Sequence, residues 1–411
     1  MKTLQKICLT IFIAINCNGA LADQNIQIIG GNQAGLPTVA VVTFNNDLSN
    51  NNNITNTVMN DLMITGEFSV KQYNSASDVE SSIQCIITGS IDNNKLNYTI
   101  TPNIQTTTSK KTITGSINID NNDIRHSAHQ LSNLAYKNFT NINGIFTSKI
   151  AFIIRDKSKY ELIISDYDGY NQKVMLTTNS PIISVTWNKT GDQIAYASFE
   201  TNKPVVYVQD VYKVNRYKIA NFNGSNSSPA FSLADNSKLA VTLSKDYGSH
   251  IYLVSNKPNS PTANKLINFG TIDTEANIGK NGSIVFTSNH DGGPQIFMTD
   301  MKGSTPVRIT QQLGNYNTTA RLSHDLSKIT FINRNSGVLK TYVMDLGTKS
   351  AYPVSQNTSL DMAPTFSPND KLILFSSNNS MYITNTTGTT QTRLKNISGD
   401  IIDQSWANNF E

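Results

Sequence analysis

The sequence predicts a mainly β protein: a small N-terminal α/β domain followed by a six-bladed β-propeller that the C-terminal strand closes. One observation is a four-strand unit that recurs six times, with an Ile-Ala-Tyr-like strand at Ile150, Ile194, Leu239, Ile284, Ile329 and Ile373. The spacing of 44 or 45 residues is typical of propeller blades. The second observation is that the chain before Ile150 does not repeat and mixes helical with strand patterns.

Each repeat also carries a bulky anchor residue, and these residues are Trp187, Phe231, Ile278, Leu322, Phe366 and Trp406. The strand of Ile150 has no anchor before it, whereas Trp406 has no Ile-Ala-Tyr strand after it. The two incomplete units complement each other. We therefore expect the strand of Trp406 to complete the blade of Ile150, which leaves no open sheet edge in the ring.

The first 22 residues have the pattern of a secretory signal peptide. Lys2 and Lys6 precede a short apolar run, and Ala20-Leu21-Ala22 is a typical cleavage site, which we favour over lipidation at Cys17. Cleavage would leave Cys85 as the one remaining cysteine and a net charge of (33 − 2) − 29 = +2. That balance favours neither nucleic acid nor an acidic membrane as a partner, and no later segment is apolar enough to span a membrane.

Four regions are expected after the leader: a flexible segment at 23–36, an α/β domain at 37–140, a linker at 141–148 and the propeller at 149–411. In the α/β domain we expect strands at 37–44 and 85–89, a hairpin of 96–100 with 112–119, a helix from Ile54 that Gly66 ends, and a helix over 124–139 capped by Asn122 or Asp123. The segment 23–36 alternates apolar and polar residues before its glycines. It is either a frayed terminus or a strand that adds to a partner's sheet edge.

Signs of catalysis or metal binding are few. The sequence has no nucleophile elbow and no phosphate-binding loop. His126 and His129 share one helical face, but no third ligand accompanies them, which favours a structural or interface role. Asp166 and Asp168 before Gly169 resemble the start of a calcium loop, yet the later ligands are missing, so we interpret them as a hairpin turn. We therefore expect no catalytic residue, cofactor or metal.

Propeller topology places a set of polar residues on one face of the ring. Around the channel mouth we expect Ser184, Asn226, Ser228, Thr274, Glu275, Thr319 and Asp361, and further out His250, His290, Asp291, Arg334 and Asn379. Such a mouth could seat a protein loop or a small ligand, or could be a set of ordinary solvated loops. Because these sites are expected to be exposed, substitutions at Ser228 and Glu275 should leave stability nearly unchanged.

The junction between the two domains resembles a known family. It runs Arg125-His126-Ser127-Ala128-His129-Gln130, then Asn143-Gly144-Ile145-Phe146, Lys149-Ile150-Ala151-Phe152 and Asp166-Tyr167-Asp168-Gly169-Tyr170. With Asn60-Asp61-Leu62 upstream, this is similar to the TolB family of periplasmic proteins in the Tol–Pal system. The resemblance covers the whole chain, and residues 125–170 are its most specific part.

The resemblance implies a periplasmic, non-enzymatic protein that supports outer-membrane integrity and envelope constriction at cell division. It implies that the propeller face binds the lipoprotein Pal, with Ser228, Thr274 and Glu275 near the mouth. It also implies that the N-terminal segment binds the C-terminal domain of TolA through Asp23, Gln24, Asn25, Ile26, Gln27, Ile28 and Ile29. The alternative is a periplasmic propeller enzyme, a cyclase or glycan hydrolase, that would need a tight cluster of carboxylates or histidines at the same mouth.

Overall fold

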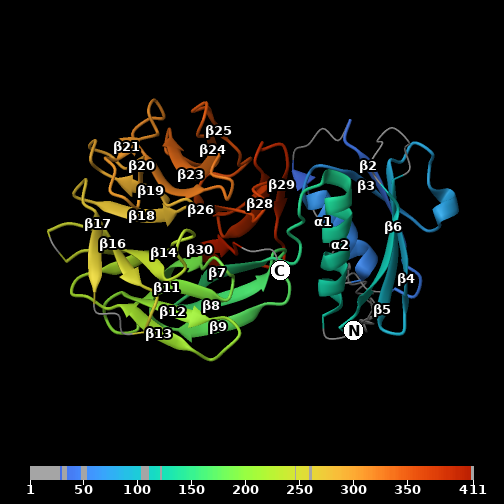
Figure 1. Ribbon diagram of the computed structural model, residues 1–411, viewed down its shortest axis with the longest axis horizontal. Helices are drawn as coiled ribbons and strands as arrows, with labels where there is room; N and C mark the ends of the chain where they lie inside the picture. The colour runs from blue at the N-terminus through green and yellow to red at the C-terminus, as the bar shows by residue number, and fades with distance from the viewer. Residues whose placement is uncertain are drawn as a thin grey trace, which may run out of the picture.

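The computed structural model describes residues 28–29, 35–47, 53–102, 111–120, 123–245, 247–258 and 262–408. The predicted signal peptide and the segment 23–27 lie outside this range. Figure 1 shows two bodies side by side, a propeller and a smaller α/β unit, with two helices between the small sheet and the propeller. The predicted fold class is confirmed.

The α/β unit is built on one five-stranded sheet in the order β3-β2-β4-β5-β6. Its elements are β2 (Thr38–Val42), α1 (Ile54–Ile64), β3 (Ser69–Tyr73), the 3-10 turn η1 (Ala76–Asp78), β4 (Cys85–Asp92), β5 (Lys95–Pro102), β6 (Ile113–Asn118) and α2 (Ile124–Thr140). β2 runs parallel to β3 and β4, and β4, β5 and β6 are antiparallel neighbours. The edge strand β3 is not among the predicted strands, because its half-exposed residues form no apolar period.

Local sequence sets the limits of both helices. The Asn53 side chain accepts a hydrogen bond from the Asn56 N–H at the start of α1. Asp123 does the same for the His126 N–H at the start of α2, so that Asp123 and not Asn122 is the cap. α2 ends at Asn141, whose left-handed φ of 62° suits an asparagine.

Six sheets form the ring, each with four strands of the repeat, and β1 (Ile28–Ile29) adds a fifth strand to the last one. From the innermost strand outward they are β30 (Asp400–Trp406), β7 (Lys149–Asp156), β8 (Lys159–Asp166), β9 (Lys173–Thr178); β10 (Ile182–Trp187), β11 (Gln193–Ser198), β12 (Val205–Asp210), β13 (Arg216–Ala220); β14 (Asn226–Phe231), β15 (Lys238–Leu243), β16 (His250–Ser255), β17 (Ala263–Ile267); β18 (Asp273–Ile278), β19 (Ser283–Ser288), β20 (Gln295–Asp300), β21 (Val307–Arg308); β22 (Asn317–Leu322), β23 (Lys328–Asn335), β24 (Val338–Asp345), β25 (Ala351–Pro353); and β26 (Asp361–Phe366), β27 (Leu372–Ser377), β28 (Ser380–Asn385), β29 (Gln391–Arg393).

The predicted closure of the ring is confirmed. β30 pairs with β7, and in this register Trp406 lies directly opposite Ile150. Both indoles are buried, Trp187 and Trp406 being 1% exposed each. The anchors end the innermost strands and pack between blades, so that the ring is held by apolar contacts as well as by its closing ladder.

The two bodies share one hydrophobic core. Val58 and Leu62 of α1 and Leu131 of α2 belong to the same buried cluster as Leu394 and Trp406 of the propeller. A short strand, β1 (Ile28–Ile29), precedes the α/β unit in the sequence but belongs to the propeller. It pairs antiparallel with β29 and adds a fifth strand to the last blade. The described part of the segment predicted to bind a partner therefore lies at the edge of the last propeller blade.

Candidate functional site

A cavity of about 330 Å³ opens at the centre of the ring, between the innermost strands. Its walls include five of the nine residues predicted for the Pal-binding face, namely Ser184, Ser228, Glu275, Thr319 and Asp361. Arg321, Met362 and Asp403 also line it and were not predicted. The innermost strands thus bring polar groups from every blade to one concave site.

Five of the cavity-lining residues share an unusual backbone conformation. Ser184, Ser228, Glu275, Thr319 and Ala363 have φ values between 46° and 62°. Each lies at a β-bulge, where the register of the innermost strand slips against the second strand. Left-handed backbone at a non-glycine residue costs on the order of 1 kcal/mol, and strained positions of this kind cluster at functional sites.

Glu275 links two blades across the cavity wall. One of its oxygens accepts hydrogen bonds from the Thr319 backbone N–H at 2.9 Å and from Thr287 Oγ1 at 2.8 Å. The other accepts from Thr319 Oγ1 at 3.1 Å. The expectation that Glu275 is a freely exposed carboxylate is therefore wrong: it is half-buried and holds the bulge of the next blade.

Asp403 is a further carboxylate of the cavity, beside Glu275 and Asp361. Burial raises the pKa of Asp403 to about 6, against the attraction of Arg321, and the nearby negative charge of Glu275 raises it further. Arg321 also lines a small recess beside the anchors Trp187, Phe231 and Phe366, so it contributes to both cavities. The cavity therefore combines three carboxylates, those of Glu275, Asp361 and Asp403, with one arginine.

The other predicted face residues divide into two groups. Asn226 and His250 are buried, and each shapes a loop: Asn226 bonds the backbone of Phe222, and His250 Nδ1 lies 3.1 Å from Asp273 Oδ2. Asp361 is also fully buried, and its Oδ2 accepts from the Thr341 N–H at 2.8 Å. Asn226 and His250 can therefore influence a partner only through the loops that they hold, whereas Asp361 also lines the cavity.

Thr274 and His290 remain accessible. Thr274 is half-buried, with its Oγ1 3.3 Å from Ser228 Oγ. His290 is exposed and stacks on Phe269, with ring centroids 3.8 Å apart.

Apolar side chains stand on the same side of the ring. Ile272 and Leu360 come directly before the innermost strands β18 and β26, and they are 50% and 52% exposed. Met362, which lines the cavity, is 39% exposed. Tyr247 is fully exposed in the loop that the Ser249–Ile272 bridge holds beside β18. A polar cavity rimmed by exposed apolar residues has the composition of a protein-docking surface.

A positional signal in the sequence could have found two of the three missed residues, Arg321 and Asp403. Asp403 lies three residues before its anchor Trp406, as Ser184, Ser228, Glu275 and Thr319 lie before theirs. Arg321 lies one residue before its anchor, Leu322. The anchors therefore locate Asp403 and Arg321, but not Met362, which lies four residues before its anchor, Phe366.

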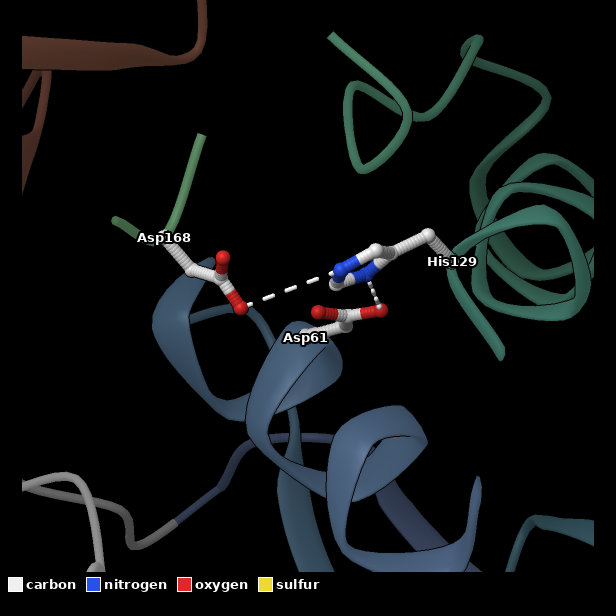
Figure 2. A group of neighbouring side chains, drawn as sticks. All are labelled: Asp61, His129 and Asp168. Atoms are coloured by element: carbon white, nitrogen blue, oxygen red, sulfur yellow. Dashed lines mark hydrogen bonds and ion pairs between the residues drawn. The ribbon is translucent and has the colours of Figure 1, made fainter. Parts of the chain in front are cut away.

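A second polar cluster lies where α1 and α2 meet the turn after β8. Figure 2 shows His129 of α2 between Asp61 of α1 and Asp168 of the turn. His129 Nδ1 lies 2.8 Å from Asp61 Oδ2, and ligand-type atoms of the three residues lie within 4.8 Å of one another. The turn is the one predicted at Asp166 to Gly169. Arg125 donates to Asp168, which already places a cation in this cluster.

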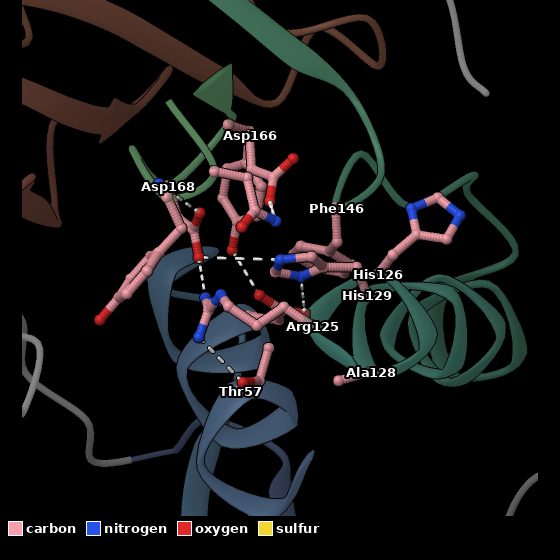
Figure 3. Close-up of polar contacts among 12 residues, drawn as sticks. Thr57, Arg125, His126, Ala128, His129, Phe146, Asp166 and Asp168 are labelled. Carbon is pink, nitrogen blue, oxygen red and sulfur yellow. Dashed lines mark hydrogen bonds and ion pairs between the residues drawn. The ribbon is translucent and has the colours of Figure 1, made fainter. Parts of the chain in front are cut away.

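The two histidines of α2 do not converge. Figure 3 shows His126 pointing away from the cluster, and its Nε2 lies 3.1 Å from Gln130 Nε2. His129 is 1% exposed and reaches the propeller instead.

Among the described residues, no helix is both long and apolar enough to cross a membrane.

Comparisons with known proteins agree on one family. The family described as TolB beta propeller domain matches residues 136–410, more than half of the chain. The Tol-Pal system protein TolB of Bordetella pertussis is 37% identical over 182 residues, which cover 44% of this chain and 41% of that protein. TolB of Francisella tularensis subsp. holarctica is 31% identical over 304 residues, covering 69% of this chain and 66% of that protein.

A solved structure extends the likeness to both bodies. The crystal structure of TolB from Acinetobacter baumannii matches with a TM-score of 0.82 and 28% identity, over 93% of this chain and 100% of that chain. The alignments span about two fifths and two thirds of the Bordetella and Francisella proteins. Because the family match spans residues 136–410 and the solved TolB structure matches both bodies, the chain belongs to the TolB family.

Proposed function

We propose that this chain is a non-catalytic, periplasmic interaction protein that binds Pal through the cavity end of the propeller and TolA through residues 23–29. Its role would be to maintain outer-membrane integrity and to support envelope constriction at cell division. The observation that carries the Pal proposal is the cavity of about 330 Å³ with its rim of exposed apolar side chains. A loop of a partner protein could enter the cavity while flanking residues pack on Ile272 and Leu360.

Energetic anchors at interfaces are buried apolar or aromatic contacts surrounded by polar groups. Ile272, Leu360 and Met362 fit this description, because they are exposed in the free protein and adjoin a polar cavity. The backbone at Ser228, Glu275 and Thr319 is set by the bulges before any partner arrives. Such preorganisation reduces the entropic cost of binding.

Calorimetric titration with the soluble domain of Pal tests this proposal. We expect Ile272→Asp and Leu360→Asp each to weaken binding by about 30-fold or more, which corresponds to roughly 2 kcal/mol at an interface anchor. Val307→Asp is the matched control, because Val307 is 60% exposed on the outer strand β21. Equal affinities for all three variants and the wild type would place the Pal site elsewhere.

The TolA proposal rests on the placement of β1. In the pairing of β1 with β29, Ile28 is the partner of Thr392. A strand at the end of a sheet is exchangeable for pairing with another sheet edge, since its main-chain hydrogen bonds are the same in kind. We therefore propose that TolA captures the segment after it leaves β29.

Two variants separate the segment's role from its release. Deleting residues 23–29 should abolish binding to the TolA C-terminal domain and leave Pal affinity unchanged. Ile28→Cys with Thr392→Cys should form a disulfide, since Cα atoms of antiparallel partners lie about 4.5–5.5 Å apart. The oxidised form should lose TolA binding and regain it on reduction, with Thr392→Cys alone as control. Undiminished binding by the oxidised form would mean that TolA recognises the segment while it is docked.

The alternative of a propeller enzyme has one observation in its favour, the raised pKa of Asp403 beside Glu275. Both oxygens of Glu275 already accept hydrogen bonds from Thr319 or Thr287, which makes Glu275 a poor second carboxylate for acid–base work. Asp403→Asn distinguishes the two functions. Glycan hydrolysis or cyclase turnover by the wild type that Asp403→Asn loses would support the enzyme, whereas no turnover by the wild type together with intact Pal binding supports the interaction protein.

A further inference from the structure

The cluster between the two domains is almost dry. Asp61 and His129 have 1% side-chain exposure each, and Arg125 and Asp168 have 9% and 13%. Figure 3 shows the cluster between α1, α2 and the turn after β8. Two carboxylates and one guanidinium leave one negative charge without a counterpart among these groups. Burying an unbalanced charge is costly, so the cluster requires another cation.

The hydrogen bonds that Asp61 accepts show which ring nitrogen of His129 carries a hydrogen. Asp61 accepts at both oxygens, from Tyr167 Oη at 2.6 Å and from His129 Nδ1 at 2.8 Å. Nδ1 of His129 therefore carries a hydrogen. In a neutral imidazole, Nε2 would then present its lone pair to Asp168 Oδ2, which lies 3.8 Å away. Nε2 is buried and has no hydrogen-bond partner among the described residues.

We propose that His129 is an imidazolium in the folded protein and acts as a proton-dependent latch between the domains. The cation lies between Asp61 of the α/β domain and Asp168 of the propeller, and supplies the positive charge that the cluster requires. Loss of the proton loosens the turn 167–170 from α2. This latch does not depend on which partners the protein binds.

The charged neighbours of His129 act in both directions, and their balance raises its pKa. Burial works against the imidazolium, but Asp61 of α1, followed by Asp168 of the turn, outweighs it, so that the pKa of His129 is raised despite Arg125. Burial raises the pKa of Tyr167 well above its usual range, so its hydroxyl stays a donor. The stabilisation is complete below the ordinary histidine pKa of about 6.5 and is lost as the pH rises through the raised value.

The metal interpretation of the same residues is weaker. Arg125 donates to the Asp168 oxygen that faces His129, and its guanidinium stacks 3.7 Å above the Tyr170 ring. Its Nη1 donates to Thr57 Oγ1 at 3.1 Å, which fixes the guanidinium in place. A divalent ion would have to displace this held cation.

Proton-detected NMR of the full chain with ¹³C-labelled histidine tests the latch directly. The spectrum has five histidine signals to follow over pH 5.5–9, and His129→Gln identifies the one that matters. If that variant does not fold, the other four histidines are assigned by substitution instead. We expect His129 to titrate above a free histidine, and Asp168→Asn to lower its pKa because a neighbouring negative charge is removed.

Asp166→Asn is the matched control, because Asp166 lies in the same turn but pairs with Lys149 instead. It should leave the His129 titration unchanged. A His129 that titrates at or below the free value would overturn the proposal. So would a titration that shifts on addition of EDTA, since the cation would then be a metal.

Hydrogen exchange separates a latch from a merely buried histidine. After correction for the intrinsic pH dependence of exchange, amides of 165–172 should lose about tenfold protection or more once His129 deprotonates. In Asp168→Asn the same amides should be weakly protected at every pH. Unchanged protection across the His129 titration would show that the proton does not hold the domains together.

Discussion

The indole Nε1 of Trp406 donates a hydrogen bond to Ser148 Oγ at 2.8 Å, so the last innermost strand holds the segment by which the chain enters the ring. Trp406 also stacks with Tyr167, at a centroid distance of 6.3 Å. We expect Trp406→Ala to reduce the free energy of unfolding of the full chain by about 3–5 kcal/mol, through the cavity it leaves. Urea denaturation measures this, with fully exposed Val214→Ala as the control that should change stability by less than about 0.5 kcal/mol.

The Glu275–Thr319 contact leads to a stability prediction that differs from the exposed-site expectation. Glu275→Ala leaves the Thr319 N–H and two hydroxyls without their shared acceptor. We expect a loss of about 1–3 kcal/mol in the free energy of unfolding. Glu80→Ala, at an exposed pair with Lys71, should leave the free energy of unfolding nearly unchanged. Equal losses for the two variants would show that the contact between blades contributes nothing.

The raised pKa of Asp403 predicts that the free energy of unfolding depends on pH. Its pKa is raised from 3.8 to about 6, mainly by burial, so the folded state keeps a proton that the unfolded chain has released. Stability contributed by this group is therefore present at low pH and lost as the pH rises through about 6. Asp403→Asn removes that loss, so its stability relative to wild type should increase over this window. Denaturant midpoints at several pH values measure the difference, and a pH-independent difference would contradict the raised pKa.

Gly66 tests the contact between the domains. A Cβ at Gly66 would come within 2.4 Å of Thr390 Cγ2 in the propeller, and its φ is +66°. We expect Gly66→Ala to lower the melting temperature by several degrees more than Gly303→Ala. Gly303 has φ +85°, and a Cβ there would have nothing within 4 Å. Gly303→Ala therefore measures only the cost of placing an alanine in left-handed backbone. Thr390→Gly should partly rescue Gly66→Ala if the clash with Thr390 is the cause.

Periodicity accounts for what was predictable at the candidate site. The spacing of the anchors located the blades, the closing strand and the side of the ring on which Ser184, Ser228 and Thr319 lie. It did not distinguish exposed from buried members, because Asn226 and Asp361 are polar residues that serve buried loop backbone. Polar residue type alone does not reveal whether the hydrogen-bond partner is water or the chain itself.

By itself, the sequence determined the six-bladed ring, the α/β domain and the two helix faces, because each follows from spacing between residues near in the chain. Only the tertiary structure decided that Glu275 spans two blades and that β1 pairs with β29. It also decided that His129 lies between carboxylates of different domains. These contacts join residues far apart in sequence, and their hydrogen bonds and charges depend on distances that only packing sets.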